Sequence, residues 1–219
     1  MHDKFIIIDG YCVITGSTNF TNNGFGYNSN NSIVIFSNEL AQDYMNEFNE
    51  MFEKGYYGKN SLDNKPYKEV EFDSGLIEPY FTPEDNLTDR IIELIDNAEK
   101  SIHVMIFTFS KREIADALIR AKDRGIKVKV IAEEYQSNHD WSQIYYLEEN
   151  GVNVILDKNN KTFHHKTIII DEKITITGSF NFTNSAQYNN DENSLIIHSE
   201  YISKEYEREF FRLWEKYTK

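Results

Sequence analysis

Residues 2–9 read HDKFIIID, and residues 164–171 repeat this stretch as HHKTIIID. Each copy is followed at the same distance by a second block, GSTN at residues 16–19 and GSFN at residues 178–181. The two copies align without a gap. An internal repeat at this long separation indicates two duplicated half-domains, because solenoid proteins repeat every ~20–50 residues.

The repeated stretch predicts a β-hairpin in each half. In the first copy, residues 5–8 and 12–15 are short apolar runs separated by an Asp-Gly dipeptide, which is typical of tight hairpin turns. In the second copy, the corresponding strands are expected at residues 166–171 and 174–177. The same local structure is therefore expected twice.

Each hairpin begins with a histidine and a lysine two residues apart, His2 with Lys4 and His164 with Lys166. Because side chains alternate across a β-strand, the two members of each pair point to the same face. The sequence therefore predicts an imidazole beside an ammonium group in both halves.

Alternating strand and helix patterns predict an α/β fold, because such alternation produces a sheet with helices on its faces. Further strands are expected at residues 32–36, 76–81, 102–109, 126–132, 152–156 and 194–198. Helices are expected at residues 38–54, 86–99, 112–124, 140–150 and 200–217.

The pattern divides the chain into a first half at residues 1–54, a connector at residues 55–74 and a second half at residues 75–219. Strand–helix units occupy residues 76–163 ahead of the second motif, whereas only Met1 precedes the first motif. The first half is therefore expected to be truncated at its N-terminus. A missing N-terminal segment, or a second copy in a homodimer, would supply the absent layer.

The spacing His-x-Lys, four residues, Asp, six residues, Gly-Ser-x-Asn occurs in both copies. It resembles the signature of the phospholipase D superfamily, which includes phospholipases, cardiolipin synthases, bacterial endonucleases and tyrosyl-DNA phosphodiesterases. The resemblance implies a mixed sheet flanked by helices, with the two halves related by a pseudo-twofold axis. It also implies phosphodiester hydrolysis or transfer without a cofactor.

The resemblance further implies a role for each repeated side chain. One histidine attacks phosphorus and forms a covalent phosphohistidine, while the other protonates the leaving alcohol and then activates water. Asp9 and Asp171 stand at strand ends, where we expect them to organise a turn. The candidate catalytic residues are His2, Lys4, Asp9, His164, Lys166 and Asp171, and the candidate phosphate-binding or supporting residues are Ser17, Asn19, Ser179, Asn181 and Glu192.

One difference between the copies predicts which histidine is the nucleophile. Glu192 aligns with Asn30, and in the family an acidic residue at this position accepts a hydrogen bond from the catalytic histidine of the opposite half. If this family contact is carried over to this chain, Glu192 would accept a hydrogen bond from His2, whereas His164 would have only the neutral Asn30 as its partner. A carboxylate raises imidazole basicity more than an amide does. We therefore expect His2 to be the nucleophile and His164 the general acid.

Composition constrains the partners of the protein. The chain has 23 basic and 36 acidic residues, which gives a formal net charge of −13. Non-specific nucleic-acid binders tend to be basic, so this balance weighs modestly against tight, sequence-independent DNA binding. A local basic cleft can nevertheless work inside an acidic protein. No metal site is expected, because zinc-type ligand spacing is absent and the motif lysines would repel a cation.

Other global features are those of an ordinary globular protein. Cys12 is the single cysteine among 219 residues, so an intrachain disulfide is impossible and nothing marks an oxidising compartment. The sequence has no signal peptide and no apolar run near the ~20 residues of a membrane span. A cytoplasmic location is therefore the default expectation.

Four aromatic residues follow the strand expected to end near residue 132: Tyr135, Trp141, Tyr145 and Tyr146. Loops at this edge of an open sheet often border ligand sites, so these rings could form a wall for stacked bases or acyl chains. Helix packing is the simpler interpretation of the same spacing, and we favour it.

Three functions are consistent with the sequence. A nuclease is the first choice, because compact family members with little beyond the two motifs are often nucleases and no membrane-binding segment is visible. A phospholipase D that hydrolyses or transfers phosphatidyl groups is the alternative, and the acidic composition favours it somewhat. The third is an inactive, truncated product that keeps the motifs without activity.

Overall fold

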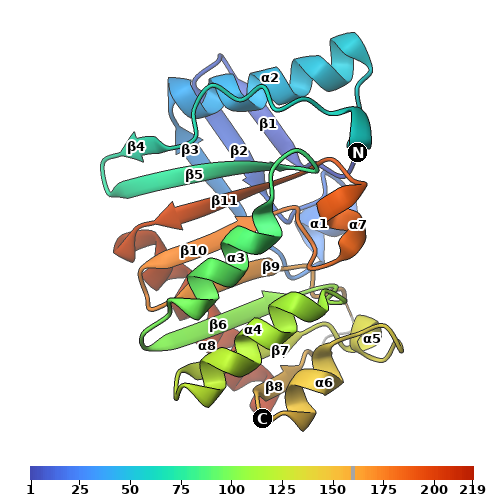
Figure 1. Cartoon of the computed structure of the whole chain (residues 1–219), viewed down its shortest axis with the longest axis vertical. Coiled ribbons are helices and arrows are strands. Elements are labelled where there is room, and N and C mark those ends of the chain that lie inside the picture. The colour runs from blue at the N-terminus through green and yellow to red at the C-terminus, as the bar shows by residue number, and fades with distance from the viewer. Residues whose placement is uncertain (159–160) are drawn as a thin grey trace.

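Two β-sheets organise the computed structural model of the chain, which describes residues 1–158 and 161–219 (Figure 1). The smaller sheet contains, in spatial order, β1 (Phe5–Ile8), β2 (Cys12–Gly16) and β3 (Ser32–Phe36). The larger sheet contains, in spatial order, β4 (Val70–Phe72), β5 (Gly75–Thr82), β11 (Glu192–His198), β10 (Ile174–Gly178), β9 (Lys166–Ile170), β6 (Ser101–Ile106), β7 (Lys127–Ala132) and β8 (Asn153–Leu156).

Helices connect the strands and cover the sheets. None of the described helices is both long enough and apolar enough to cross a membrane. The helices are α1 (Asn22–Gly26), α2 (Asn38–Lys54), the 3₁₀ turn η1 (Gly58–Asn60), α3 (Leu87–Asp96), α4 (Arg112–Asp123), α5 (Glu134–Ser137), α6 (Ile144–Glu149), α7 (Asn184–Tyr188) and α8 (Glu200–Thr218).

The larger sheet is mixed. Strands β6, β7 and β8 run parallel to one another, while β6 pairs antiparallel with β9 and the remaining neighbours are antiparallel. Parallel neighbours need a crossover connection, which α4 supplies between β6 and β7. The predicted α/β class, a mixed sheet flanked by helices, is confirmed.

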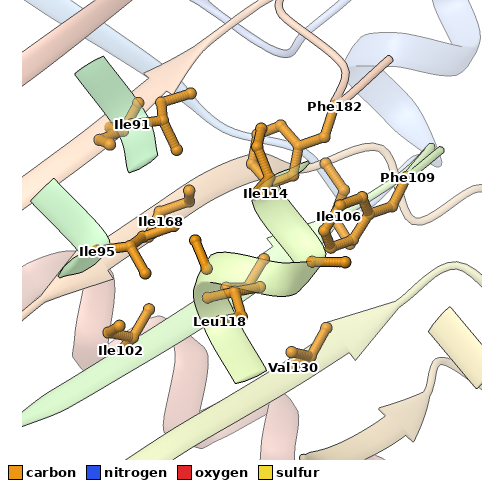
Figure 2. Packing of buried hydrophobic residues seen from close by; sticks show 14 of the residues in the cluster. Ile91, Ile95, Ile102, Ile106, Phe109, Ile114, Leu118, Val130, Ile168 and Phe182 are labelled. Atoms are coloured by element: carbon orange, nitrogen blue, oxygen red, sulfur yellow. The ribbon is translucent and has the colours of Figure 1, made fainter. Parts of the chain in front are cut away.

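The main core lies between the larger sheet and the helices α3 and α4. Figure 2 shows Ile91 and Ile95 of α3 and Leu118 of α4 beside Ile102 and Ile168 of the sheet. Each of these side chains is essentially inaccessible to solvent. Fully burying an aliphatic side chain contributes about 1.5–3 kcal/mol, so this layer is the main source of stability.

Helix α8 covers the opposite face of the same sheet, where it passes behind β6 and β7 in Figure 1. Its residues Phe210 and Leu213 pack with Met105, Ile131 and Ile169 from three neighbouring strands. The strand interiors are therefore apolar on both sides, as expected for sheet strands covered by helices on both faces.

The smaller sheet is covered by α2 on one face. Leu40 and Tyr44 of this helix pack with Val13 and Ile35, and the same cluster continues to Ile77 of β5. The smaller and larger sheets therefore share a hydrophobic core.

The other face of the smaller sheet is exposed. Ile6 and Ile8 of β1 lie in register with β2 and β3, and they share this face with Val34 and Phe36. All four are exposed large hydrophobic residues.

The repeated sequence reproduces the local caps of the helices. Thr21 and Thr183 each accept a hydrogen bond from a backbone N–H three residues later, at 3.1 Å in both halves. Ser37 and Ser199 cap α2 and α8 in the same way. Such side-chain caps satisfy otherwise unpaired N–H groups at helix starts.

Several parts of the chain differ from the sequence prediction. The strand expected at residues 102–109 ends at Ile106. The helix expected at residues 140–150 starts later, at Ile144, and the short α5 precedes it because the Glu133 side chain caps the Gln136 N–H. The segment expected to be an irregular connector contains β4, in which the buried Val70 pairs with Ile77.

Candidate active site

The two motif strands present the expected imidazole–ammonium pairs. Lys4 Nζ donates to the carbonyl oxygen of His2 at 2.5 Å, and Lys166 Nζ donates to that of His164 at 3.1 Å. Both lysines are buried. The lysine side chain therefore folds back toward the histidine of its own motif in each half.

Backbone hydrogen bonds join each motif histidine to the other half. His2 N donates to Asp191 O at 2.8 Å, and His164 N donates to Ser29 O at 2.6 Å. Ser29 and Asp191 occupy aligned positions of the repeat. The two contacts are therefore related by a pseudo-twofold axis, and they bring both histidines to the junction between the halves.

Glu192 is the partner of His2, as the sequence predicts. His2 Nδ1 lies 2.6 Å from Glu192 Oε2, and this carboxylate is buried. Ser179 Oγ donates to the same oxygen at 2.7 Å, while Asn190 Nδ2 donates to Oε1 at 3.0 Å. The contact fixes the ring through Nδ1, so Nε2 is the nitrogen of His2 that remains for substrate.

His164 has a different environment. Its Nδ1 lies 2.8 Å from the carbonyl oxygen of Ser17, which can only accept, so Nδ1 carries the proton. Nε2 lies 3.2 Å from Lys166 Nζ. Burial, together with the positive charges of Lys166, Lys4 and His2, lowers the pKa of His164 to about 3. These charges come from both motifs, so the two motifs share one electrostatic environment.

The prediction that Asn30 is the partner of His164 is wrong. Asn30 does not support the ring but accepts from Thr18 Oγ1 at 2.8 Å and donates to Gly24 O at 2.8 Å. A backbone carbonyl takes its place on His164. The Asn30 side chain forms hydrogen bonds with residues close to it in sequence. The alignment of Asn30 with Glu192 did not reveal these local partners.

Both lysines are held in an environment that disfavours their charge. Burial lowers the pKa of Lys166 well below its usual range, and the nearby charge of Lys4 adds to this effect. Burial also lowers the pKa of Lys4, which the Glu192 carboxylate partly offsets. An anionic phosphate placed between the two ammonium groups would relieve this penalty.

The serines of the second block organise the site rather than face a ligand. Ser179 Oγ donates to Glu192, and Ser17 Oγ accepts from the backbone N–H of Asn31 at 3.1 Å. Asn19 and Asn181 are half-buried, and Asn181 Oδ1 is buried without a hydrogen-bond partner among the described residues. The asparagines are thus better placed than the serines to meet a ligand.

Asp9 and Asp171 lie away from the histidines. Seven residues separate each from its histidine, which corresponds to roughly 23 Å along a strand. Asp171 accepts from the backbone N–H groups of Glu99, Lys100 and Ser101 at 2.7–2.9 Å. Both aspartates therefore lie at the turn end of their hairpins, and Asp171 anchors the β9–β10 turn to the start of β6.

Asn31 and Asn193 are site residues that the sequence interpretation missed. Asn193 Nδ2 donates to Asp3 at 2.8 Å, and Asn31 Nδ2 contacts His165 at 3.1 Å, in each case across the junction. Thr177 Oγ1 donates to Asn31 Oδ1 at 2.8 Å. Both asparagines lie at the same position of the repeat, so their identity in the two copies was the available signal.

The aromatic residues after β7 do not all pack as favoured from the sequence. Tyr135, Trp141 and Tyr145 are exposed. Tyr146 is half-buried, with the Arg112 guanidinium 3.3 Å from its ring centroid. The helix-packing interpretation therefore holds for Tyr146 and is wrong for the other three.

Comparisons of the sequence with known proteins identify relatives of this chain. A family model described as cardiolipin synthase, PLD-like domain, matches residues 1–52 and 91–214. A phospholipase D of Rickettsia conorii is 35% identical over 147 residues, which cover 67% of this chain and 74% of that protein. A mitochondrial cardiolipin hydrolase of Xenopus tropicalis is 34% identical over 166 residues, covering 70% and 79%.

Solved structures agree with the sequence relatives. The phospholipase D family member Nuc from Salmonella typhimurium has a TM-score of 0.60 at 30% identity, covering 64% of this chain and 93% of that one. A phosphatidylserine synthase of Haemophilus influenzae has a TM-score of 0.69 at 17% identity, covering 97% and 61%, and shows the shared fold. The chain belongs to the phospholipase D superfamily of phosphodiesterases.

Proposed function

We propose that this protein hydrolyses phosphodiesters through a covalent phosphohistidine on His2, and that its substrate is nucleic acid. The observation that supports the chemistry is the junction itself, where His2 with its Glu192 partner and His164 with Lys166 come from opposite halves. A buried site with two ammonium groups is suited to a single phosphate group.

The proposed reaction has two steps. Nε2 of His2 bonds to phosphorus while the bond to the leaving alcohol breaks, and His164 gives that alcohol its proton. Water then attacks phosphorus, His164 takes the proton, and the phosphorus–nitrogen bond breaks. Burial and the nearby lysine charges lower the pKa of His164 to about 3, and a bound phosphate that offsets the lysine charges would raise it, which favours the protonated ring that acts as the acid.

Nucleic acid remains the preferred substrate for two reasons. Two solved structures that this chain covers almost completely carry the names Nuc and NucT; NucT from Helicobacter pylori has a TM-score of 0.57 at 27% identity, covering 64% of this chain and 95% of that one. In addition, the parallel strands β6 and β7 end at the same sheet edge, where Phe107 packs on His164 and the exposed rings of Tyr135 and Trp141 follow β7. Exposed aromatic rings near a phosphate site can stack bases.

Phospholipid is the second candidate, and a specific cavity favours it. A space of about 310 Å³ beside the first motif is lined mainly by apolar side chains, including Phe5, Phe20, Phe48, Met51 and Phe52. A cavity of this volume could hold part of an acyl chain. The relatives named phospholipase D and cardiolipin hydrolase support the same candidate.

One assay panel separates the candidates. The protein and its His164→Ala variant are incubated in EDTA with plasmid, single-stranded DNA, RNA and phosphatidylcholine vesicles. Cleavage of nucleic acid that persists in EDTA and disappears in the variant supports the nuclease. Choline release would instead favour the lipase, and inactivity on every substrate would favour the inactive product.

We also propose that additional polypeptide covers the exposed face of the smaller sheet in the working protein. Ile6, Ile8, Val34 and Phe36 form an apolar surface beside β1, whose outer edge pairs with no other strand among the described residues. A strand followed by an amphipathic helix, from a preceding segment or a second copy, would fit both the edge and the face. Sedimentation of a dimer favours the second copy, and a monomer at high concentration excludes it.

A further inference from the structure

A groove of about 820 Å³ lies on the α8 side of the larger sheet, at the start of β6 and β7. Its floor includes Ser101 and His103 of β6, which pair in register with Lys127 and Lys129 of β7. Residues two apart on a strand share a face, so both β7 lysines belong to this side. We refer to this cavity as the basic groove.

The basic groove concentrates positive charge in an acidic protein. The whole chain carries a net charge of −13, yet the groove is lined by five cations and two carboxylates. Glu207 Oε1 lies 2.6 Å from His103 Nδ1, so one of the two carboxylates already has a close neighbour within the groove. The lining residues that carry charge are Lys100, Lys127, Lys129, Lys204, Arg208, Glu172 and Glu207.

Much of this positive charge is available to a ligand. Lys100 and Lys127 have no ion-pair partner in the part of the chain that the structure describes. Lys204 and Arg208 contact Glu200 and Glu205, but those pairs lie on the exposed side of α8, and exposed pairs are worth about 0–1 kcal/mol. A phosphate can therefore compete for both.

Aromatic rings lie among the cations. Phe211 lines the basic groove, and Lys129 Nζ lies 5.2 Å from its ring centroid and 4.7 Å from that of Trp214. A positively charged groove with aromatic rings is the combination that binds single-stranded nucleic acid, because phosphates meet cations while bases stack. A bilayer surface would meet a convex or flat patch more readily than a groove.

The repeat offers an internal comparison. Lys204 and Arg208 of α8 align with Gln42 and Asn46 of α2, and Phe211 aligns with Asn49. The equivalent positions of α2 are therefore uncharged and carry no aromatic ring. The positive charge is therefore found on α8 and not on α2, the helix at the equivalent position of the first half.

We propose that the basic groove binds the backbone of a single-stranded nucleic acid, remote from the catalytic junction. It lies at the first residues of β6, whereas Phe107, just past the last residue, packs on His164 with ring centroids 4.7 Å apart. Six residues of strand span roughly 20 Å. At ~3.4 Å per nucleotide, a strand of roughly six nucleotides or more reaches from the groove to the junction.

Binding is tested without relying on catalysis. A fluorescein-labelled oligothymidylate of about 20 nucleotides is titrated by fluorescence anisotropy into full-length His164→Ala protein, which does not cut it under the mechanism above. The same protein carrying Lys127→Glu and Lys129→Glu is compared with one carrying Lys54→Glu and Lys68→Glu, two exposed lysines outside the groove. Both double variants change the net charge equally.

The groove variant is expected to bind at least about tenfold more weakly than the control variant. Its plot of log affinity against log salt should also be shallower by about 1.4, because each phosphate contact on a single strand contributes roughly 0.7. Equal losses in the two variants would overturn the proposal, since they would reflect total charge alone. Matching circular dichroism and melting temperatures check that both variants fold.

Two further readouts complete the test. If phosphatidylglycerol vesicles bind through the groove lysines and the oligonucleotide does not, the groove would instead be a membrane-binding surface.

A second test measures cleavage and rests on the proposed nuclease function. In the active protein, groove substitutions should slow cleavage of long oligonucleotides but leave hydrolysis of bis-p-nitrophenyl phosphate unchanged. If His164→Ala leaves all hydrolysis intact, the proposed function fails, while the binding result still decides the groove.

Discussion

Ile168 of β9 is fully buried beneath α3 and α4, whereas the aligned Ile6 of β1 is 40% exposed. The same contrast holds on the helices, where Phe210 of α8 is buried and the aligned Phe48 of α2 is 41% exposed. The side chains are identical in type, so the difference comes from what covers them. The apolar pattern of a hairpin thus shows that its side chains can be buried. Whether they are buried depends on the helices that cover the sheet.

The catalytic groups differ between the halves in a second way. His2 is paired with a buried carboxylate, while His164 is paired with a backbone carbonyl and surrounded by positive charge. The Glu192 carboxylate therefore stabilises positive charge on the His2 ring. The His164 ring is kept neutral until an anion offsets the nearby positive charges. A duplicated motif has acquired two distinct environments through its partners.

The largest expected effect separates the two histidines. His2→Ala should lower kcat/KM by about 10⁴-fold or more on every substrate, because it removes the proposed nucleophile. His164→Ala should be comparably slow on DNA, but on a p-nitrophenyl ester its first step should be much less impaired, because this leaving group needs no proton. The second step, in which His164 takes the proton of water, should stay slow on both substrates. Stopped-flow release of p-nitrophenol in the first turnover, compared with the first turnover on DNA, checks this. If both variants lost the same activity on both substrates, the assignment of nucleophile to His2 and general acid to His164 would be wrong.

Burial predicts the next largest effect. Ile168→Ala should lower the free energy of unfolding by about 2–5 kcal/mol, because it leaves a cavity under α3 and α4. Ile6→Ala removes a side chain that is 40% exposed and should cost a small fraction of that. Urea unfolding of both variants makes the comparison. Similar losses would mean that other polypeptide covers Ile6 in the purified protein.

A substitution at the carboxylate partner sharpens the electrostatic contrast. Glu192→Gln keeps the shape but removes the charge beside His2, so kcat should fall by about 10- to 100-fold, which corresponds to a charged hydrogen bond of about 1.5–3 kcal/mol. Asn30→Ala is the matched control, because Asn30 does not contact His164. A larger loss for Asn30→Ala in enzyme kinetics would contradict the assignment.

The smallest expected effect concerns pH and the aligned residues Asp3 and His165. Burial raises the pKa of Asp3 to about 7 and lowers that of His165 to about 3. Asp3 therefore contributes stability that is lost as pH rises from about 4 through 7. His165 contributes stability that is present above about pH 6.5 and lost as pH falls toward 3.

These signs give opposite outcomes for two variants in thermal unfolding. Relative to its own value at pH 5, Asp3→Asn should lose less stability than the parent protein at pH 7. His165→Gln should lose less than the parent at pH 5. A parallel shift of both variants at all pH values would show that neither group titrates in the transition.

The motif geometry was predictable because it depends on local rules. Strand alternation placed His2 beside Lys4, and the apolar stripe with the Ser37 cap set the bounds of α2. The partner of His164 was not predictable, since a backbone carbonyl has no sequence signature. The basic groove was also missed, because its lysines just before β6, on β7 and on α8 are far apart along the chain and meet only through the sheet order.

The most direct test of the shared phosphate site is to trap its intermediate. The protein is mixed with a ³²P-labelled p-nitrophenyl phosphodiester, quenched in alkali within the first turnover and digested for peptide mapping. One phosphoryl group per chain on His2, absent from His2→Ala, is the predicted result. Label on His164 would reverse the roles, and hydrolysis without any labelled histidine would contradict the mechanism.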